Sequence, residues 1–291
     1  MATVKLRPLI VILGETASGK SGLATELARN FNGELISADS WAVYREFNIG
    51  TAKPNEVEQA ETTHHLIDIA DPKIGFSAAE FKRQASNAIE AIFKKGKNPI
   101  LVGGTGLYID SLLFNYNFLP AGPSSQRKRL NGLSIQELLQ EVDSKDISLV
   151  GIDSRNKRRL IRLIEVNGQR PSHQDLRSNT LIIGLKISRA QLEIQITKRV
   201  DEMLGKGLEQ EVIDLAKKYG WQAEPMKGIG YREWKAYFDG GQNLEQTRQQ
   251  IITNTLQLAK KQRTWFKRNN SIHWVDSQTA AIDLVKEFLN K

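Results

Sequence analysis

The apolar positions of the first 119 residues follow two different spacings. A short, uninterrupted apolar run stands at 9–13, and shorter strand-like stretches with apolar centres stand at 34–37 and 98–104; each ends close to a glycine or a polar turn. Between them, 21–30 and 76–95 carry apolar residues every three or four positions. A buried parallel strand is apolar on both faces, whereas a helix is apolar along one stripe. The alternation therefore predicts a parallel sheet with helices on its faces.

The pattern changes after this first stretch. Proline, glycine and serine cluster at 120–125, which predicts a boundary, and 134–142 is a short amphipathic helix. The chain after residue 155 is mostly helical, apart from a strand-like run at 180–187. We expect the later helices at 189–204, 208–219 and 244–267. The predicted organisation is one core formed by 1–119 and 151–291, interrupted by a short helical insertion at 120–150.

The segment that joins the first strand to the first helix reads GETASGKS. It fits the pattern G-x-x-x-x-G-K-[S/T], in the strand–loop–helix context that such a loop requires. Glycines let the backbone amides surround a phosphate, Lys20 adds a positive charge, and the Ser21 hydroxyl suits a Mg²⁺ ion carried by the phosphates. A carboxylate at Glu15 should face away from the anion. The residues expected to bind a diphosphate or nucleotide are Gly14, Glu15, Thr16, Ala17, Ser18, Gly19, Lys20 and Ser21.

With this loop, the predicted fold is α/β, a P-loop NTPase-like parallel sheet flanked by helices, with a small helical insertion and a mostly helical C-terminal half. Kinases, other ATP-binding NTPases and other diphosphate users share the loop, so it does not identify the reaction.

Polar residues at other strand ends are further candidates. Asp39 follows the second strand at the ligand-binding edge of such a sheet, where it binds metal, acts as a general base or caps a turn. Thr105 stands in a second glycine turn, and Lys53 lies in a polar loop, both within reach of a phosphate. His64 and His65 are adjacent, so on a strand they point to opposite faces. No third metal ligand accompanies them, and we expect a structural role.

The charge of the chain favours an anionic partner, and nucleic acid is the first expectation. The net charge is +8 and the isoelectric point about 9.5. Two segments are locally basic, 152–171 and 253–270, and the second contains no acid. In the second segment, Trp265 and Phe266 stand among the cations. These two aromatic residues either contact RNA or belong to the core. A merely basic soluble protein is the alternative.

Composition also bears on location. The sequence has no cysteine, no run of eighteen apolar residues and no signal peptide pattern at its start. We therefore expect a cytoplasmic protein without a membrane span, and nothing suggests an obligate dimer, so we expect a monomer.

Taken together, the motifs resemble those of the tRNA dimethylallyltransferases, which prenylate the adenosine beside the anticodon. The matching segments, in the family's order, are GETASGKS, ISADSWAVY, IGTAKP, HHLIDI, LVGGTGLY, KGIGYREW and LQLAKKQRTWF. The resemblance implies a prenyltransferase that moves a dimethylallyl group from dimethylallyl diphosphate to the exocyclic amine of adenosine 37. Its implied substrates are tRNAs that read codons starting with U, bound through the anticodon stem-loop, and its implied cofactor is Mg²⁺.

The resemblance also implies residue roles. Asp39 matches the general base, while Thr105 and Arg232 match residues near the diphosphate. Trp41 and Tyr44 are candidate walls of a base pocket. The stretches implied to contact tRNA are Asp39, Ser40, Trp41 and Ala42, and then Arg158, Arg159, Leu160, Ile161 and Arg162. Two departures stand out: Glu15 replaces a usual proline, and the insertion after Pro120 looks shorter, with one clear helix.

Three other functions compete with this interpretation. An adenylate dimethylallyltransferase, which makes cytokinins, would share the loop and the base, but a mononucleotide needs no basic surface. A small-molecule kinase would consume ATP. An RNA-binding protein with a vestigial nucleotide site would not need intact Lys20, Ser21, Asp39 and Thr105.

Overall fold

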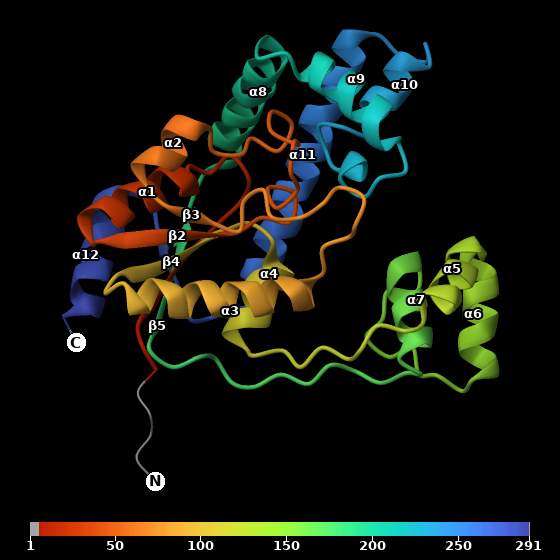
Figure 1. Ribbon diagram of the computed structural model, residues 1–291, viewed down its shortest axis with the longest axis horizontal. Coiled ribbons are helices and arrows are strands. Elements are labelled where there is room, and N and C mark those ends of the chain that lie inside the picture. The colour runs from red at the N-terminus through yellow and green to blue at the C-terminus, as the bar shows by residue number, and fades with distance from the viewer. Residues whose placement is uncertain (1–5, 291) are drawn as a thin grey trace. The chain divides into compact units, whose positions relative to one another are not determined.

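The computed structural model describes residues 6–290 and divides the chain into two compact units (Figure 1). The first, the core unit, comprises Met1–Leu113 and Arg177–Lys291, and the second, the helical unit, comprises Phe114–Leu176. Among the described residues, every helix is too short or too polar to cross a membrane.

A single six-stranded parallel sheet forms the centre of the core unit, in the order β3-β2-β4-β1-β5-β6. The predicted parallel sheet is confirmed. Because all strands run the same way, their carboxyl ends meet at one edge. The strands are β1 (Leu9–Leu13), β2 (Gly33–Ala38), β3 (His64–His65), β4 (Asn98–Gly103), β5 (Thr180–Leu185) and β6 (Ile272–Val275).

Helices cover both faces of this sheet (Figure 1). On one face, α1 (Lys20–Asn30) and α12 (Gln278–Leu289) pack into one apolar cluster with β1, β4 and β5. The buried stripe of α1 contains Leu23 and Leu27, four residues apart, so both point to the sheet. On the other face, α3 (Ala78–Lys94) packs on β2 and β4 and against α4 (Gly106–Leu113).

A second apolar cluster in the core unit joins its helical C-terminal part to the loop after β2. Its largest fully buried side chains are Trp234, Tyr231 and Phe47. This cluster fixes α8 and α11, which contribute residues to the site below. The helices of this part are α8 (Arg189–Gly205), α9 (Leu208–Tyr219), the 3-10 helix η1 (Pro225–Lys227), α10 (Trp234–Phe238) and α11 (Leu244–Phe266), and the short α2 (Glu56–Glu61) follows β2.

The helical unit is larger than the insertion expected at 120–150. It contains α5 (Ser124–Gly132), α6 (Ile135–Ser144) and α7 (Lys157–Glu165) around their own apolar core. The unit extends past residue 150 because α7 buries its apolar face against the other two helices. The expectation of one helix between 120 and 150 is wrong, since α5 precedes α6. Helix α5 is nearly all polar, with Leu130 as its buried residue, so its sequence shows no regular spacing of apolar residues.

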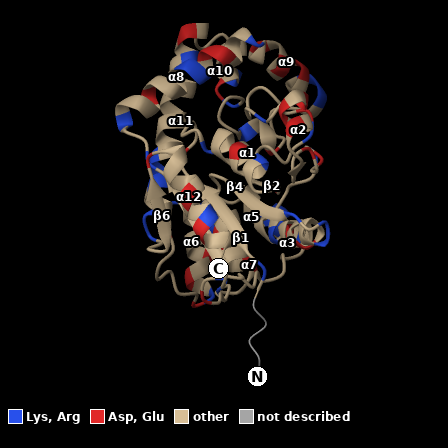
Figure 2. Ribbon diagram, turned by 90° about the vertical axis from the view of Figure 1, so that its left-hand side faces the viewer, with Lys and Arg blue, Asp and Glu red and all other residues tan. Residues whose placement is uncertain are grey.

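Charged residues lie mainly on helices and loops (Figure 2). The six strands contain one Lys, Arg, Asp or Glu residue, Glu34 of β2. Its carboxylate is buried and accepts hydrogen bonds from Lys95 and Lys97 and contacts the His65 ring at 2.7 Å. Burial raises the pKa of Glu34, but the contacts with His65, Lys97 and Lys95 outweigh it and lower that pKa to about 2. This cluster supports β2, whose other end leads into Asp39.

Replacing Glu34 by glutamine is expected to lower the free energy of unfolding at pH 7 by about 1–3 kcal/mol, because two lysines lose their buried partner. The folded-state pKa lies below the ordinary value of 4.5. The difference in free energy of unfolding between wild type and Glu34→Gln should therefore be complete above about pH 4.5 and disappear as the pH falls towards 2. Urea titrations followed by tryptophan fluorescence measure this, since all five tryptophans lie in the core unit.

The matched control is Glu80→Gln, which removes an exposed carboxylate paired with Arg83. This substitution should lower the free energy of unfolding by less than about 0.5 kcal/mol. An equal loss in both variants, or a Glu34 effect that does not shrink between pH 7 and pH 3.5, would contradict the assigned role.

Candidate functional site

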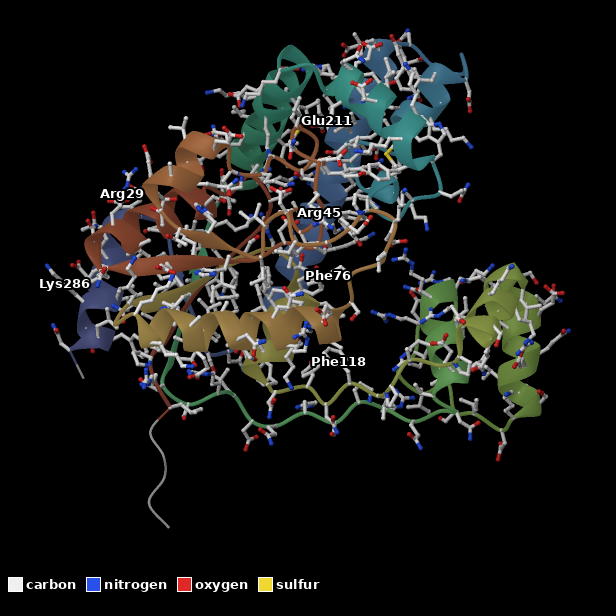
Figure 3. All side chains as sticks on the ribbon, viewed as in Figure 1. Arg29, Arg45, Phe76, Phe118, Glu211 and Lys286 are labelled. Carbon is white, nitrogen blue, oxygen red and sulfur yellow. The ribbon has the colours of Figure 1, made fainter. Side chains whose placement is uncertain are left out.

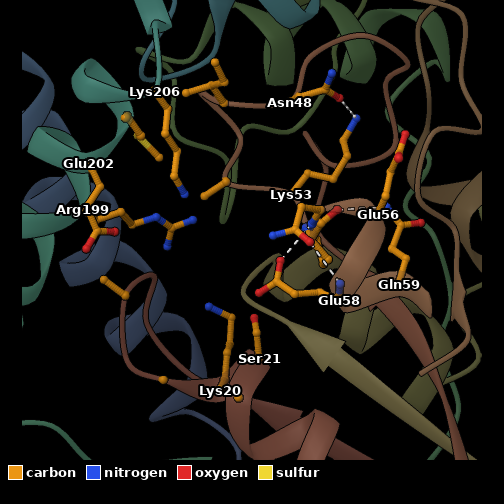
Figure 4. A pocket seen from close by; sticks show the side chains of 18 of the residues that line it. Lys20, Ser21, Asn48, Lys53, Glu56, Glu58, Gln59, Arg199, Glu202 and Lys206 are labelled. Carbon is orange, nitrogen blue, oxygen red and sulfur yellow. Dashed lines mark hydrogen bonds between the residues drawn. The ribbon is translucent and has the colours of Figure 1, made fainter. Parts of the chain in front are cut away.

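The loop between β1 and α1 has the geometry of an anion-binding nest. Ala17 and Gly19 have positive φ angles of 60° and 87°, which turn successive amides towards one side. The helix α1 then begins at Lys20 without a side-chain cap at Gly19. Its first amides thus stay available to an anion and add the positive end of the helix dipole. Lys20 and Ser21 point from this loop into a cavity (Figure 4).

Two cations converge on the loop. The Lys20 ammonium donates to the Glu15 carbonyl oxygen at 3.1 Å. Arg199 of α8 places its guanidinium 3.4 Å from the Thr16 hydroxyl. Burial and then the nearby Arg199 charge lower the pKa of Lys20 to about 8, against the opposite effects of Asp39 and Glu15. Burial likewise lowers the pKa of Arg199. Two desolvated cations beside a nest of amides form a site for a doubly charged anion.

Arg199 was missed by the sequence interpretation, although its helix carries a signal. Leu192, Ile196 and Met203 are buried on one stripe of α8, and Arg199 occupies a position of the same stripe. An arginine at a core position of an amphipathic helix requires a partner, and here that partner is the loop of residues 14–21, called the phosphate loop below.

Arg232 is expected near the diphosphate, and in this structure it pairs with the residue that follows it in the chain. Its side chain is half exposed and bonds to the buried Glu233 carboxylate at 3.0 Å. With Lys227 and Lys235 it lines a separate cavity of about 230 Å³ beside Trp221. The polar motif GIGYRE fixes a turn here, because Glu233 also accepts a hydrogen bond from the amide of Gly230.

Asp39 and Thr105 lie together at the ends of β2 and β4, as the parallel sheet predicts. One Asp39 carboxylate oxygen accepts hydrogen bonds from the amides of Trp41 at 2.8 Å and Ala42 at 3.3 Å. The Thr105 hydroxyl accepts from the Ser40 amide at 3.1 Å, so it holds the turn that carries Asp39. The carboxylate is half-buried and keeps a fixed direction.

The last turns of α11 hold the phosphate loop from the other side. The Gln262 side chain accepts from the Thr16 amide at 2.8 Å and donates to the Gly104 carbonyl at 3.0 Å. Glu15 faces away from the nest, as expected, and its carboxylate pairs with Arg263. Of the aromatic pair in this basic segment, Phe266 is buried and the Trp265 ring donates to Asp110 at 2.8 Å. Both aromatic side chains thus belong mainly to the packing of the core unit.

The cavity above the loop has a volume of about 910 Å³. Lys53, expected to face a phosphate, instead holds the cavity wall. Its ammonium is buried and donates to the Tyr44 carbonyl at 2.7 Å, to Asp68, and to Asn48, the contact that can be followed in Figure 4. The residues from the phosphate loop, the loop after β2 and α8 that line the cavity include Lys20, Ser21, Asn48, Lys53, Arg199, Glu202 and Lys206.

A narrower cavity of about 80 Å³ lies next to this one. Arg199 lines both cavities, while Asp39 and apolar side chains such as Ile196 and Ile251 line the narrow one. Glu211 of α9, labelled in Figure 3, holds a segment that lines both cavities. Its carboxylate accepts hydrogen bonds from the amides of residues 48–50, of which Asn48 and Ile49 line the larger cavity and Gly50 the narrow one. An anion-binding end, a fixed carboxylate and an apolar lining thus meet in one place.

The loop after β1 offers one candidate ligand for a metal ion, the Ser21 hydroxyl. Within residues 6–290, no three His, Cys, Asp or Glu side chains gather as a metal site. His64 contacts the Thr62 carbonyl and His65 contacts Glu34, in keeping with a structural role. The exposed Ser21 hydroxyl at the start of α1, with the oxygens of a bound diphosphate, is a ligand set that suits Mg²⁺.

The stretches expected to contact tRNA are partly buried. Ala42 and Tyr44 are buried, while Ser40 and Trp41 are half-buried. In α7 of the helical unit, Leu160 and Ile161 are also buried, as expected for core-facing residues. Arg162 donates to the carbonyls of Leu119 and Pro120. The exposed cations of this stretch are Arg158 and Arg159.

Comparison with known proteins gives a consistent result. The model of the IPP transferase family matches residues 42–269. A tRNA dimethylallyltransferase of Bacillus cytotoxicus is 40% identical over 92% of this chain and 90% of its own. The structure of a tRNA delta(2)-isopentenylpyrophosphate transferase from Staphylococcus epidermidis superposes with a TM-score of 0.73, at 35% identity over 98% of this chain and 99% of that one.

A eukaryotic dimethylallyltransferase described as acting on tRNA superposes with a TM-score of 0.84, at 26% identity over 98% of this chain and 80% of its own. The family resemblance of the motifs is thereby confirmed over most of the length. The chain belongs to the IPP transferase family.

Proposed function

We propose that this protein transfers the dimethylallyl group of dimethylallyl diphosphate to the exocyclic amine of adenosine 37 in tRNAs that read codons starting with U. The products are isopentenyladenosine in tRNA and diphosphate. The observation that carries the proposal is the pair of adjoining cavities, in which Arg199 connects the anion-binding loop to the Asp39 carboxylate. The names of the relatives, which are tRNA dimethylallyltransferases, support the same reaction.

The phosphate loop holds the leaving group in this proposal. Its amides, Lys20 and Arg199 bind the diphosphate and stabilise the negative charge that grows as the carbon–oxygen bond breaks. Since these groups are already fixed and desolvated, they need little rearrangement during the reaction. The Ser21 hydroxyl would hold a Mg²⁺ ion, which supplies further neutralisation of the diphosphate charge when bound.

Asp39 is the proposed general base. The amine nitrogen forms a bond to the allylic carbon, the carbon–oxygen bond electrons leave with the diphosphate, and the amine proton goes to the Asp39 carboxylate. Two backbone amides fix the direction of this carboxylate, and Thr105 fixes the turn through Ser40. Donation by Thr105 to a diphosphate oxygen stays a prediction. The apolar residues of the narrow cavity suit a five-carbon chain and exclude water.

A positively charged surface supports tRNA as the acceptor. The chain carries a net charge of +8, and Arg158 and Arg159 are exposed on α7. In the core unit, Arg232, Lys227 and Lys235 surround a cavity beside Trp221, so an RNA phosphate suits Arg232 better than the prenyl diphosphate does. We further propose that the anticodon stem-loop is the part bound, that the enzyme is a monomer, and that it works in the cytoplasm.

Replacing Asp39 by asparagine is expected to lower kcat about 10²–10⁴-fold, because the isosteric amide cannot accept the amine proton. The affinity for dimethylallyl diphosphate should change little, since Asp39 does not line the larger, phosphate-binding cavity. The assay counts radiolabel transferred from dimethylallyl diphosphate, with Mg²⁺, to unmodified tRNA and, in parallel, to adenosine monophosphate.

Wild-type labelling of tRNA that is lost in Asp39→Asn is the expected outcome. Labelling of adenosine monophosphate alone would move the assignment to cytokinin synthesis. No label in either acceptor would reject the prenyl transfer, and ATP consumption would then be tested.

Arg199 and Arg232 provide a matched pair of substitutions. Arg199→Ala should lower kcat/KM for dimethylallyl diphosphate about 10²–10³-fold, because a charge-stabilising donor to the diphosphate is lost. Arg232→Ala should leave KM for this substrate within about twofold, since it lines another cavity. The reverse result, measured by steady-state kinetics at saturating tRNA, would restore Arg232 to the diphosphate site and exclude Arg199.

The pH dependence should show the titration of Lys20. Its pKa of about 8 means that the free enzyme loses this positive charge as the pH rises through 8. Since a diphosphate binds better to the charged form, kcat/KM for dimethylallyl diphosphate should fall above that pH. In Lys20→Arg the decline should move above pH 10, at a lower absolute rate. A wild-type profile that stays flat from pH 7 to 9.5 would show that Lys20 keeps its charge.

A further inference from the structure

The second residue of the phosphate loop is an acid whose position calls for an explanation. The Glu15 side chain is 9% exposed and belongs to the loop that would bind a diphosphate. A buried carboxylate close to an anion site is unfavourable, because it is poorly solvated and repels the ligand. Such a residue needs a partner that neutralises its charge.

Arg263 of α11 is that partner. Its guanidinium contacts both carboxylate oxygens, with Nε on Oε1 and Nη2 on Oε2 at 3.0 Å. This two-point contact fixes the plane of the carboxylate as well as its charge. The same contact directs the carboxylate towards α11, while the backbone carbonyl of Glu15 accepts hydrogen bonds from the Ser18 amide and the Lys20 ammonium.

The neighbouring residue of α11 reinforces the contact. Gln262 binds the Thr16 amide, one position after Glu15, and also the Gly104 carbonyl beside Thr105. Consecutive residues of α11 therefore hold consecutive residues of the phosphate loop. The loop is connected in this way to the turn that carries Thr105.

We propose that Arg263 is a positioning residue for the prenyl diphosphate: it cancels the charge of Glu15 and, together with Gln262, keeps the phosphate loop in its anion-binding form. This inference rests on the proposed function, since the anion is taken to be the diphosphate of the prenyl donor. Arg263 does not itself contact the diphosphate. Its effect passes through the Glu15 carboxylate.

A second substitution, at Glu15, distinguishes an electrostatic role of Arg263 from a role in packing. Losing Arg263 alone leaves a buried, unpaired carboxylate in the loop, which is costly. Removing the charge of Glu15 as well removes its repulsion of the diphosphate, so the double variant should recover affinity for the diphosphate. Glu15→Gln keeps the backbone carbonyl that binds Lys20, and therefore isolates the charge.

The experiment compares Arg263→Met, Glu15→Gln and the double variant by two measurements on the full chain. The first is the KM for dimethylallyl diphosphate at saturating tRNA. The second is the Kd for inorganic diphosphate with Mg²⁺ by calorimetry, which needs no turnover. For Arg263→Met we expect both constants to rise about tenfold, equivalent to about 1.4 kcal/mol, while kcat falls less than about threefold. The double variant should return to within about threefold of wild type.

The control is Lys286→Met, which removes one exposed charge from α12 of the same unit. It should leave both constants unchanged. If Arg263→Met does not fold, Arg263→Lys replaces it, because one ammonium cannot make the two-point contact, and the same rescue by Glu15→Gln is expected. Wild-type constants in the single variant, or a double variant as impaired as the single one, would overturn the proposal.

Failure of the proposed function gives a different result. Wild-type enzyme that does not label tRNA rejects the prenyl transfer. The calorimetric comparison of the variants then still decides whether Arg263 controls anion binding by the loop.

Discussion

The close approach of α11 to the second glycine turn is the contact on which the site depends. A side chain at Gly104 would begin 2.4 Å from the Gln262 amide, and one at Gly106 would begin 2.3 Å from the Trp265 ring. Glycine at both positions lets the helix lie directly on the turn. Only at this distance does one glutamine side chain connect the Thr16 amide to the Gly104 carbonyl. The ends of β1 and β4 are thereby held together in addition to their pairing in the sheet.

This packing has an electrostatic counterpart. Lys20 and Arg199 lie partly desolvated beside the nest of amides, with Asp39 and Glu15 as the acids that influence the Lys20 charge. In the proposed function, the diphosphate of the prenyl donor would neutralise these two cations. The energy needed to gather the cations is supplied by folding, through the apolar cluster that positions α8. A site prepared in this way stabilises developing charge without reorganising.

The sequence predicted those parts of the site that are local along the chain. The phosphate loop, the turn at Asp39 and the turn at Thr105 each follow a buried strand, and parallel strands bring them to one edge. The residue that it missed, Arg199, comes from a helix distant in sequence. Arg199 was missed because a charged residue in an amphipathic helix is usually on the surface, and its place on the apolar stripe with Ile196 and Met203 was the available signal. A motif match does not give the direction of a side chain, and in this structure Arg232 pairs with Glu233 and lines another cavity.

The same distinction applies to the stretch from Arg158 to Arg162. In α7, Leu160 and Ile161 build the core of the helical unit, and Arg162 holds the chain that enters it. A five-residue motif thus divides into packing residues, one structural cation and two exposed arginines. In the proposed function, the exposed cations Arg158 and Arg159 are the residues of this stretch that would neutralise an RNA phosphate backbone. The remaining residues act by fixing the helix from which these two arginines extend.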